Sequence, residues 1–315
     1  MSTTVLMLSV DEAHLLRHSL AAAAAQADVV VIDNACADGT AALAREHGAE
    51  VVALTPRRSY AAALNAGIAA GGGDAVLLLN ADCVLEPGFV AAARARLDAD
   101  PGLGSVAPKL VRAAGVGPGR QLGAMDAAGM TVDRRRKNGL VGHGAPVAAY
   151  REGGGAFGPD GAAALYRRAT LNACALGDEV LDEDLALWAS DADLAWRAQL
   201  QGWRCAYEPL AVARHVRTYS PSTRASVAEA QRRLQFRNRY LMWWKNETTA
   251  GLARDLPHIA LYEVLALGHV LLRERHLLRA YADAARGLPG ALRRRRVVQA
   301  RRVAQRPPFG LQPEA

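Results

Sequence analysis

Cysteine is scarce in this 315-residue sequence, and its spacing argues against two kinds of stabilising site. The four cysteines stand far apart and include no CxxC pair: Cys36, Cys83, Cys174 and Cys205. A structural zinc site or a disulfide framework needs cysteines at short, recurring spacings. We therefore expect four buried free thiols in a protein that works in a reducing compartment.

Signals for export and for membrane insertion are also missing. The first residues, MSTTVLMLSVDEAHLL, have no basic segment and reach an acidic pair at Asp11, so we expect no secretory signal. No apolar run has the length that a bilayer-crossing helix needs. The most hydrophobic late stretch, residues 259–272, is interrupted by Glu263 and His269. We expect it to be able to lie on a membrane but not to cross one.

Acidic residues are fewer than basic ones, and the excess of positive charge is not spread evenly along the chain. The formal net charge is +7, and the run ALRRRRVVQARRVAQR (291–306) carries much of it. Two interpretations remain open: a tail that binds a membrane surface or another polyanion, or a solvated basic helix. Hydrophobic residues make up 51% of the chain, which suits a sizeable core in one large α/β domain or two smaller lobes.

Strand and helix patterns alternate through the first hundred residues. Short, uniformly apolar runs predict strands at 4–10, 28–33, 49–55 and 75–80. Apolar residues at helical spacing predict helices at 13–26, 39–48, 59–71 and 87–100. This order predicts an α/β fold with a Rossmann-like, mostly parallel sheet and helices on both faces.

The pattern changes after residue 110. Residues 112–160 are rich in glycine and contain DRRRKNG, so we expect a loop-rich, partly mobile segment. We expect helix or strand-helix structure at 161–171 and a short strand at 203–209. Between them, residues 190–202 predict a helix in which Ser190 is the N-cap, Asp193 is the third residue and Gly202 stops the helix.

The remaining residues are helical by composition, at 225–247 and 255–300. We expect three parts in the chain. Residues 1–110 and 111–247 form the two halves of one domain, and residues 248–315 form a basic, amphipathic helical segment.

Polar side chains follow two of the predicted buried strands. Asp33 and Asp82 each follow a strand end, with Asn34 and Asn80 beside them. Ligands of parallel α/β sheets bind outside the carboxyl ends of the strands, so both acids should face one crevice. A single aspartate there could simply belong to a turn, but two at one edge indicate a polar site.

A glycine-rich phosphate loop is absent. There is no GxGxxG after the first strand and no GxxxxGK[ST] anywhere. If the crevice binds a nucleotide, a divalent metal held by a carboxylate is the alternative anchor for its diphosphate. Mg²⁺ and Mn²⁺ prefer oxygen ligands, and Asp82 is the natural carboxylate for either.

Several ordered motifs resemble those of family 2 glycosyltransferases. They are VVVIDNACADGT, LNAGIAAGGGDAVLLLNADCVLEPGF, FGPDGAAALYRRATL, LDEDLALWASDADLAWRAQLQGWRCAYEPLAVARH and RNRYLMWWKN. The resemblance spans roughly residues 3–246 and is nearest to the bacterial rhamnosyltransferase-like branch. It implies a GT-A fold and inversion at the anomeric carbon of a nucleotide-sugar donor. It also implies that residues 1–110 are the half that binds the nucleotide sugar and that residues 111–247 are the acceptor-binding and catalytic half of the same domain.

The resemblance also implies residue roles. Asp33 would contact the nucleoside of the donor, with Asn65 and Asn80 also on the donor side. Asp82 stands at the last position of the family's DxD motif, present here as Asn80-Ala81-Asp82, and would ligate the metal. His215 matches a histidine that completes the metal site in some members.

Asp191 matches the second acid of the family's ED pair, the general base that deprotonates the acceptor hydroxyl. We expect the dipole of the following helix to keep it ionised, and hence a weak base. Two departures stand out: Ser190 replaces the usual glutamate, and Val10-Asp11-Glu12 replaces the usual end of the first strand. They leave open an alternative in which the protein binds a nucleotide sugar without transferring it.

The acceptor side carries weaker signals. Trp188 is a candidate for stacking on a sugar, and Asp184 for acceptor binding in the acidic loop 182–184, although a solvated loop is the simpler interpretation there. Trp196 and Trp203 suit core packing better. Together these features predict an inverting, metal-dependent hexosyltransferase in a bacterial cell.

We expect this enzyme to move rhamnose or another hexose to a glycan or lipid-linked hydroxyl in cell-surface polysaccharide synthesis. It would be cytoplasmic, with peripheral contact to the inner face of the plasma membrane, and would bind no nucleic acid. A nucleotide-cofactor oxidoreductase is a further alternative, against which the missing glycine fingerprint argues.

Overall fold

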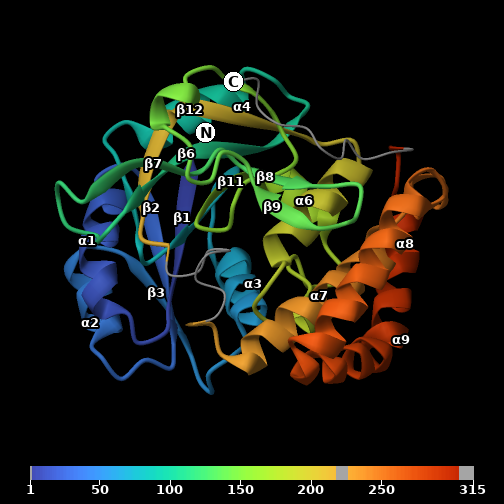
Figure 1. Cartoon of the computed structure of the whole chain (residues 1–315). Helices are drawn as coiled ribbons and strands as arrows, with labels where there is room; N and C mark the ends of the chain where they lie inside the picture. The colour runs from blue at the N-terminus through green and yellow to red at the C-terminus, as the bar shows by residue number, and fades with distance from the viewer. Residues whose placement is uncertain (1, 218–225, 305–315) are drawn as a thin grey trace.

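The fold is built on one large sheet with helices packed against it (Figure 1). The computed structural model describes residues 2–217 and 226–304. Within these residues, ten strands join in one sheet whose main order is β10-β12-β6-β11-β4-β1-β2-β3, with β5 paired to β12 and β7 to β6. Two further short strands, β8 and β9, form a separate hairpin.

The first hundred residues have the predicted alternation. The strands are β1 (Thr3–Ser9), β2 (Asp28–Asn34), β3 (Glu50–Leu54) and β4 (Ala75–Asn80). The helices are α1 (Ala13–Ala24), α2 (Thr40–Glu46), α3 (Tyr60–Ala70) and α4 (Phe89–Asp98). The four strands pair in parallel, as predicted.

Uniformly apolar strands are explained by burial on both faces of the sheet. In β1, Val5 and Met7 pack into one core and Leu6 and Leu8 into the other. Successive side chains of a strand point to opposite faces, so only a strand covered on both sides can be apolar at every position.

The second half of the sheet is mixed, so the expectation of a mostly parallel sheet holds only for the first half. Its strands are β5 (Cys83–Leu85), β6 (Leu103–Ala113), β7 (Gln121–Ala127), β10 (Gly154–Ala156), β11 (Ala163–Arg167) and β12 (Arg204–His215). Strand β11 runs antiparallel between β4 and β6, whereas β12 runs parallel to β6. The boundary expected at residue 110 therefore falls inside β6.

Strand β12 is also longer than predicted. The short strand expected at 203–209 continues to His215, because β12 pairs with β6 from Arg204 onward and resumes that pairing at Val212 after an irregularity. This extension brings His215 opposite Cys83 of β5, beside Asp82.

The glycine-rich segment is more ordered than predicted. Besides β7 and β10 it contains β8 (Met130–Val132), β9 (Asn138–Leu140) and a short 3₁₀ turn η1 (Val147–Ala149). The run of arginines forms the turn between β8 and β9, and Arg136 is fully buried there. It pairs with Glu247 and with Asp255 (Nη1 to Oδ2, 2.9 Å), joining the hairpin to the C-terminal helices.

The remaining helices follow. They are α5 (Arg168–Cys174), α6 (Ser190–Leu200), α7 (Glu229–Asn246), α8 (Thr249–Leu272) and α9 (Leu278–Ala300), with 3₁₀ turns η2 (Glu183–Leu185) and η4 (Arg275–Leu277). Helices α7, α8 and α9 gather at one side of the sheet (Figure 1). All four cysteines are free thiols, three of them buried, and Trp196 is fully buried in the core.

The expectation that no apolar run has the length of a bilayer-crossing helix was wrong. Within the described residues, α8 has the length and apolar composition of a membrane-crossing helix. Residues that were expected to interrupt it do not, because Glu263 lies within a helix that continues unbroken from Thr249 to Leu272. Only 17% of its most apolar window is buried within the protein.

Candidate active site

The predicted acids meet at one edge of the sheet. Strands β2 and β4 flank β1, with Asp33 paired to Ser9 and Asn80 paired to Leu8. Asp82 follows β4 directly, and 21% of its side chain is exposed. The carboxyl ends of these parallel strands therefore bring the polar side chains to one edge of the sheet, as expected.

His215 lies beside Asp82 at this edge. Its Nε2 is 3.4 Å from Oδ1 of Asp82, and its Nδ1 is 2.8 Å from Oδ2 of Asp126. Burial alone would lower the pKa of His215, but the hydrogen bonds to Asp126 and Asp82 outweigh it and raise the pKa to about 9. The imidazole of His215 thus lies between two carboxylates.

Asp126, Asp160 and Arg217 complete this cluster, and sequence reasoning did not identify them. The guanidinium of Arg217 donates to Oδ1 of Asp126 from Nε (2.7 Å) and to Oδ2 of Asp160 from Nη2 (3.0 Å). Asp160 stands in the quoted FGPDGAAALYRRATL motif and Arg217 lies two residues after His215, so both carried a weak signal. No pattern in the sequence distinguishes Asp126.

The cluster fits a divalent metal at one particular place. Asp126, Asp160 and His215 bring ligand atoms within 4.8 Å of one another, but Arg217 already occupies both of these carboxylates. Asp82 and Nε2 of His215 face each other instead, and Asp126 holds the other ring nitrogen. A carboxylate on the far nitrogen is the usual way to orient a metal-binding histidine, so Asp82 and His215 would hold the ion.

Asp191 lies near Asp160, at the start of α6. Its Oδ2 accepts from the amide of Gly161 (3.2 Å), and its Oδ1 accepts from the amide of Ala192 (2.8 Å). Burial, and then the nearby charge of Asp160, raise the pKa of Asp191 to about 6. We expected the helix dipole to keep Asp191 ionised and therefore a weak base. Burial outweighs the dipole and raises the pKa, so the carboxylate is more basic than expected.

The start of α6 is held differently from the predicted cap. The N-cap is Ala189 in a left-handed conformation, and Ser190 is the first helical residue with its side chain buried. Asp193 is not a cap either. It is buried and paired with Arg197 (Nε to Oδ2, 2.9 Å) and Lys245 (Nζ to Oδ1, 2.8 Å). These pairs fix the helix that carries Asp191.

The predicted donor-binding residues have identifiable contacts. Oδ1 of Asp33 accepts from the amide of Cys36 (2.8 Å), so it shapes the turn after β2. The amide of Asn65 is bonded to the loop before α6, donating to Leu181 O (2.9 Å) and accepting from the amide of Leu181 (2.8 Å). Asn80 ends β4 next to Asp82 and is half-buried. Their roles toward a donor stay predictions.

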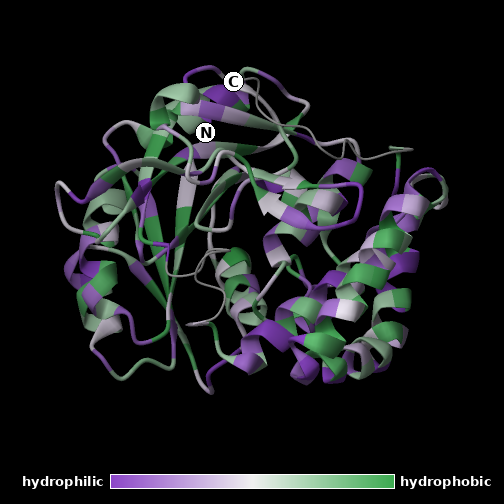
Figure 2. Ribbon diagram, viewed as in Figure 1, coloured by the Kyte–Doolittle hydropathy of each residue, from purple (hydrophilic) through white to green (hydrophobic). Residues whose placement is uncertain are grey.

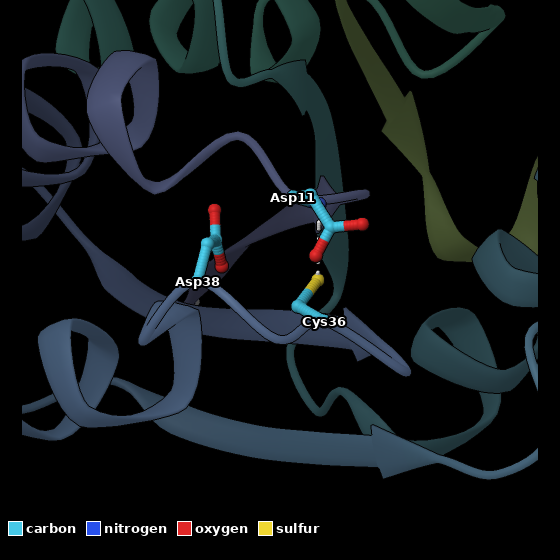
Figure 3. Close-up of side chains that lie close together, drawn as sticks. All are labelled: Asp11, Cys36 and Asp38. Atoms are coloured by element: carbon cyan, nitrogen blue, oxygen red, sulfur yellow. Dashed lines mark hydrogen bonds between the residues drawn. The ribbon is translucent and has the colours of Figure 1, made fainter.

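The altered end of the first strand forms a linked pair of loops. Asp11, Cys36 and Asp38 lie close together there (Figure 3). Asp11 accepts from the amide of Ala37 (2.8 Å) and Asp38 accepts from the amide of Ala13 (2.7 Å), so each acid ties its own loop to the other. These bonds explain the cluster without a metal.

Glu12, the next residue of this loop, lies within electrostatic range of Asp82. Burial and the charge of Asp82 raise the pKa of Glu12, which places the two carboxyl groups near each other. The departure from the family's first strand therefore adds an acid beside the proposed metal ligand.

The acceptor candidates lie farther along the chain, near α7 and α9. Asp184 pairs with Arg294 of α9, and its carbonyl accepts from Arg237. It borders a groove of about 470 Å³ between α7 and α9. Trp188 is half-buried, and its carbonyl accepts from Nδ2 of Asn238 (2.7 Å). These contacts tie the loop to the helices, and the acceptor roles stay predictions.

Comparison with known proteins identifies the family. The model described as "Glycosyltransferase like family 2" matches residues 3–238, about three quarters of the chain. The chain belongs to glycosyltransferase family 2. A further match is an uncharacterized glycosyltransferase of Mycobacterium bovis, 35% identical over 97 residues, which cover 31% of this chain and 44% of that protein. The match thus spans less than half of this relative.

Solved glycosyltransferases share the fold of this family 2 member. A mannosyltransferase from Pyrobaculum calidifontis, in complex with GDP-Man and Mn²⁺, has a TM-score of 0.53 at 18% identity and covers 95% of this chain and 85% of its own. TarS 1-349 of S. aureus, in complex with UDP-GlcNAc, has a TM-score of 0.57 at 14% identity and covers 96% and 90%. The α/β fold is that of the GT-A glycosyltransferases.

Proposed function

We propose that this family 2 glycosyltransferase is an inverting, metal-dependent enzyme that transfers a hexose from a nucleoside-diphosphate donor to a hydroxyl group. The observation that carries the proposal is the arrangement at the sheet edge. The carboxylate of Asp82 and Nε2 of His215 face each other, and at the start of α6 burial and the charge of Asp160 raise the pKa of Asp191 to about 6.

Asp191 supplies the base in this proposal. The acceptor oxygen attacks the anomeric carbon, its proton passes to the carboxylate of Asp191, and the bond from that carbon to the diphosphate oxygen breaks with inversion. A base with a pKa of about 6 is ionised at neutral pH yet far more basic than an ordinary aspartate. By raising the pKa of Asp191, burial therefore makes this residue suited to act as a general base.

Asp82 and His215 would hold the metal on the donor side. When bound, a divalent ion would neutralise charge that develops on the leaving diphosphate, an effect of several kcal/mol. Asp126 keeps the His215 ring in place, and Arg217 keeps Asp126 in place. The protein's contribution is thus an oriented pair of ligands, with Mn²⁺ or Mg²⁺ as the ion.

The donor and acceptor are proposed more coarsely. The P. calidifontis and S. aureus structures contain GDP-Man and UDP-GlcNAc, which supports a nucleotide sugar of this general kind here. We infer rhamnose or another hexose as the sugar, and a glycan or lipid-linked acceptor in cell-surface polysaccharide synthesis. We further infer a cytoplasmic enzyme.

A second candidate rests on Ser190, which replaces the family's usual glutamate. Its side chain is buried at the start of α6 and cannot act as a base. If the base belonged at that position, the protein would bind a nucleotide sugar without transferring it. The raised pKa of Asp191 favours transfer over this alternative.

The test is a calorimetric titration with UDP, GDP and dTDP, each with and without Mn²⁺. We expect tight binding of one diphosphate that requires the metal and is lost in Asp82→Asn. Asp28→Asn is the matched control, since Asp28 is exposed at the opposite end of its strand. Nucleotide binding that requires neither the metal nor Asp82 would contradict the proposed metal site.

The bound nucleotide then selects the donors for a transfer assay. Release of the diphosphate in the presence of acceptor, lost in Asp191→Asn while binding persists, would support the base. Intact binding with no turnover in the unaltered protein would favour the second candidate.

A further inference from the structure

Helix α8 leaves a broad apolar surface uncovered. Six of its large aliphatic side chains are between 46% and 79% exposed: Leu256, Leu261, Val264, Leu265, Leu271 and Leu272. At 100° per residue these positions cover about half of the helix circumference. Figure 2 shows hydrophobic residues along α8 at the edge of the molecule. Exposed surface of this extent on one element marks an interaction site.

The opposite side of α8 is fixed to the protein, so the direction of the apolar face is determined. Ile259 and Val270 are buried. Glu263, the only acid between residues 256 and 272, turns inward, where it pairs with Nη2 of Arg239 (2.6 Å) and accepts from the hydroxyl of Tyr240 (2.5 Å). The outward face of this stretch therefore carries no negative charge.

Basic residues stand at both ends of the apolar face. Arg134, Arg135 and Arg254 lie near its N-terminal end, and 35% to 52% of each side chain is exposed although each also pairs with an acid, Asp255 or Asp133. Arg273 and Arg275 are exposed at its C-terminal end. An apolar strip between two groups of arginines is complementary to a surface that has hydrocarbon beneath anionic head groups.

We propose that α8 binds an anionic lipid bilayer, lying in its interface with the apolar face inserted between head groups. Two other arrangements fit the structure less well. Crossing the bilayer would carry Glu263 and the buried Asp255 pairs into hydrocarbon or break them. Packing of α8 against a second copy would bring arginines of one copy near those of the other, whether the helices ran parallel or antiparallel.

The arginine run of α9 is a weaker candidate for this contact than sequence analysis suggested. Arg294 pairs with Glu179 (3.1 Å), Asp182 (3.1 Å) and Asp184, and Nη1 of Arg295 donates to the carbonyl of Glu247 (2.6 Å). Part of the positive charge of α9 is therefore used in contacts that hold this helix against the rest of the protein. The end of the run, residues 305–306, lies outside the described residues.

The test is co-sedimentation of the full chain with vesicles of phosphatidylcholine, with or without phosphatidylglycerol. We expect binding to the anionic vesicles and an order-of-magnitude or greater loss of partitioning in Leu261→Asp/Leu265→Asp. Arg273→Gln/Arg275→Gln should weaken binding about fivefold per arginine and reduce its salt sensitivity. Leu210→Asp is the control, since Leu210 is 76% exposed but belongs to β12.

Each outcome decides the proposal. Absence of sedimentation with both vesicle types at low salt would overturn it, as would undiminished binding by the double leucine variant. A dimer by light scattering that this variant converts to monomer would assign the face to a second copy instead. Circular dichroism verifies that the variants are folded. Because no nucleotide takes part, the result is independent of the proposed transferase activity.

Discussion

Replacing Asp191 by asparagine should make the protein more stable at pH 8 while abolishing most of its activity. In the folded protein the pKa of Asp191 is about 6, against an ordinary value of 3.8. The ionised carboxylate is therefore held in a site that disfavours its charge, because it is half-buried and lies near Asp160. Asparagine keeps the shape and removes the charge.

The size of the effect follows from that difference. About two pKa units correspond to roughly 3 kcal/mol, and partial exposure of the residue to solvent reduces this to about 1–2 kcal/mol. Above pH 6 the carboxylate is charged in both states and the folded state bears the whole penalty. Below about pH 4 it is protonated in both states, so the advantage of asparagine disappears on acidification.

Thermal unfolding measures this difference in stability between the variant and the unaltered protein directly. We expect Asp191→Asn to unfold about 2–6 °C higher than the unaltered protein at pH 8, and the gap to close near pH 4. Asp28→Asn, at an exposed position, should show no such gap. In the transfer assay the Asp191 variant should lose about 10²–10⁴-fold in rate. An equal or lower melting temperature at pH 8 would refute the account of how burial tunes this residue.

Two further predictions concern buried polar contacts. Arg136→Met should lower the free energy of unfolding by about 3 kcal/mol in chemical denaturation, since it removes the buried arginine paired with Glu247 and one of three arginines paired with Asp255, whereas Arg135→Met at the exposed neighbour should change little. An equal effect of both substitutions would contradict the burial argument. Asp126→Asn should weaken Mn²⁺ binding about 10–100-fold by releasing the ring of His215, measured by calorimetry on protein with an unchanged circular dichroism spectrum. Unaltered metal affinity would remove Asp126 from the site.

The local pattern of the sequence determined most of the first hundred residues. Uniformly apolar runs require burial on both faces, and helical spacing between them requires crossover helices, so the parallel order of β1 to β4 followed from composition alone. The same reasoning placed Asp33 and Asp82 at one edge, because carboxyl ends of parallel strands meet there. Neither step needed information about distant residues.

Contacts between distant segments decided the rest. Asp126 supports His215 from 89 residues away, and Arg136 reaches Glu247 from 111 residues away, although each looked like an ordinary loop residue. The basicity of Asp191 likewise depends on its burial and on Asp160, which tertiary packing supplies. A sequence specifies which side chains carry charge, but the free energy of that charge depends on the solvent and partners that only the folded chain provides.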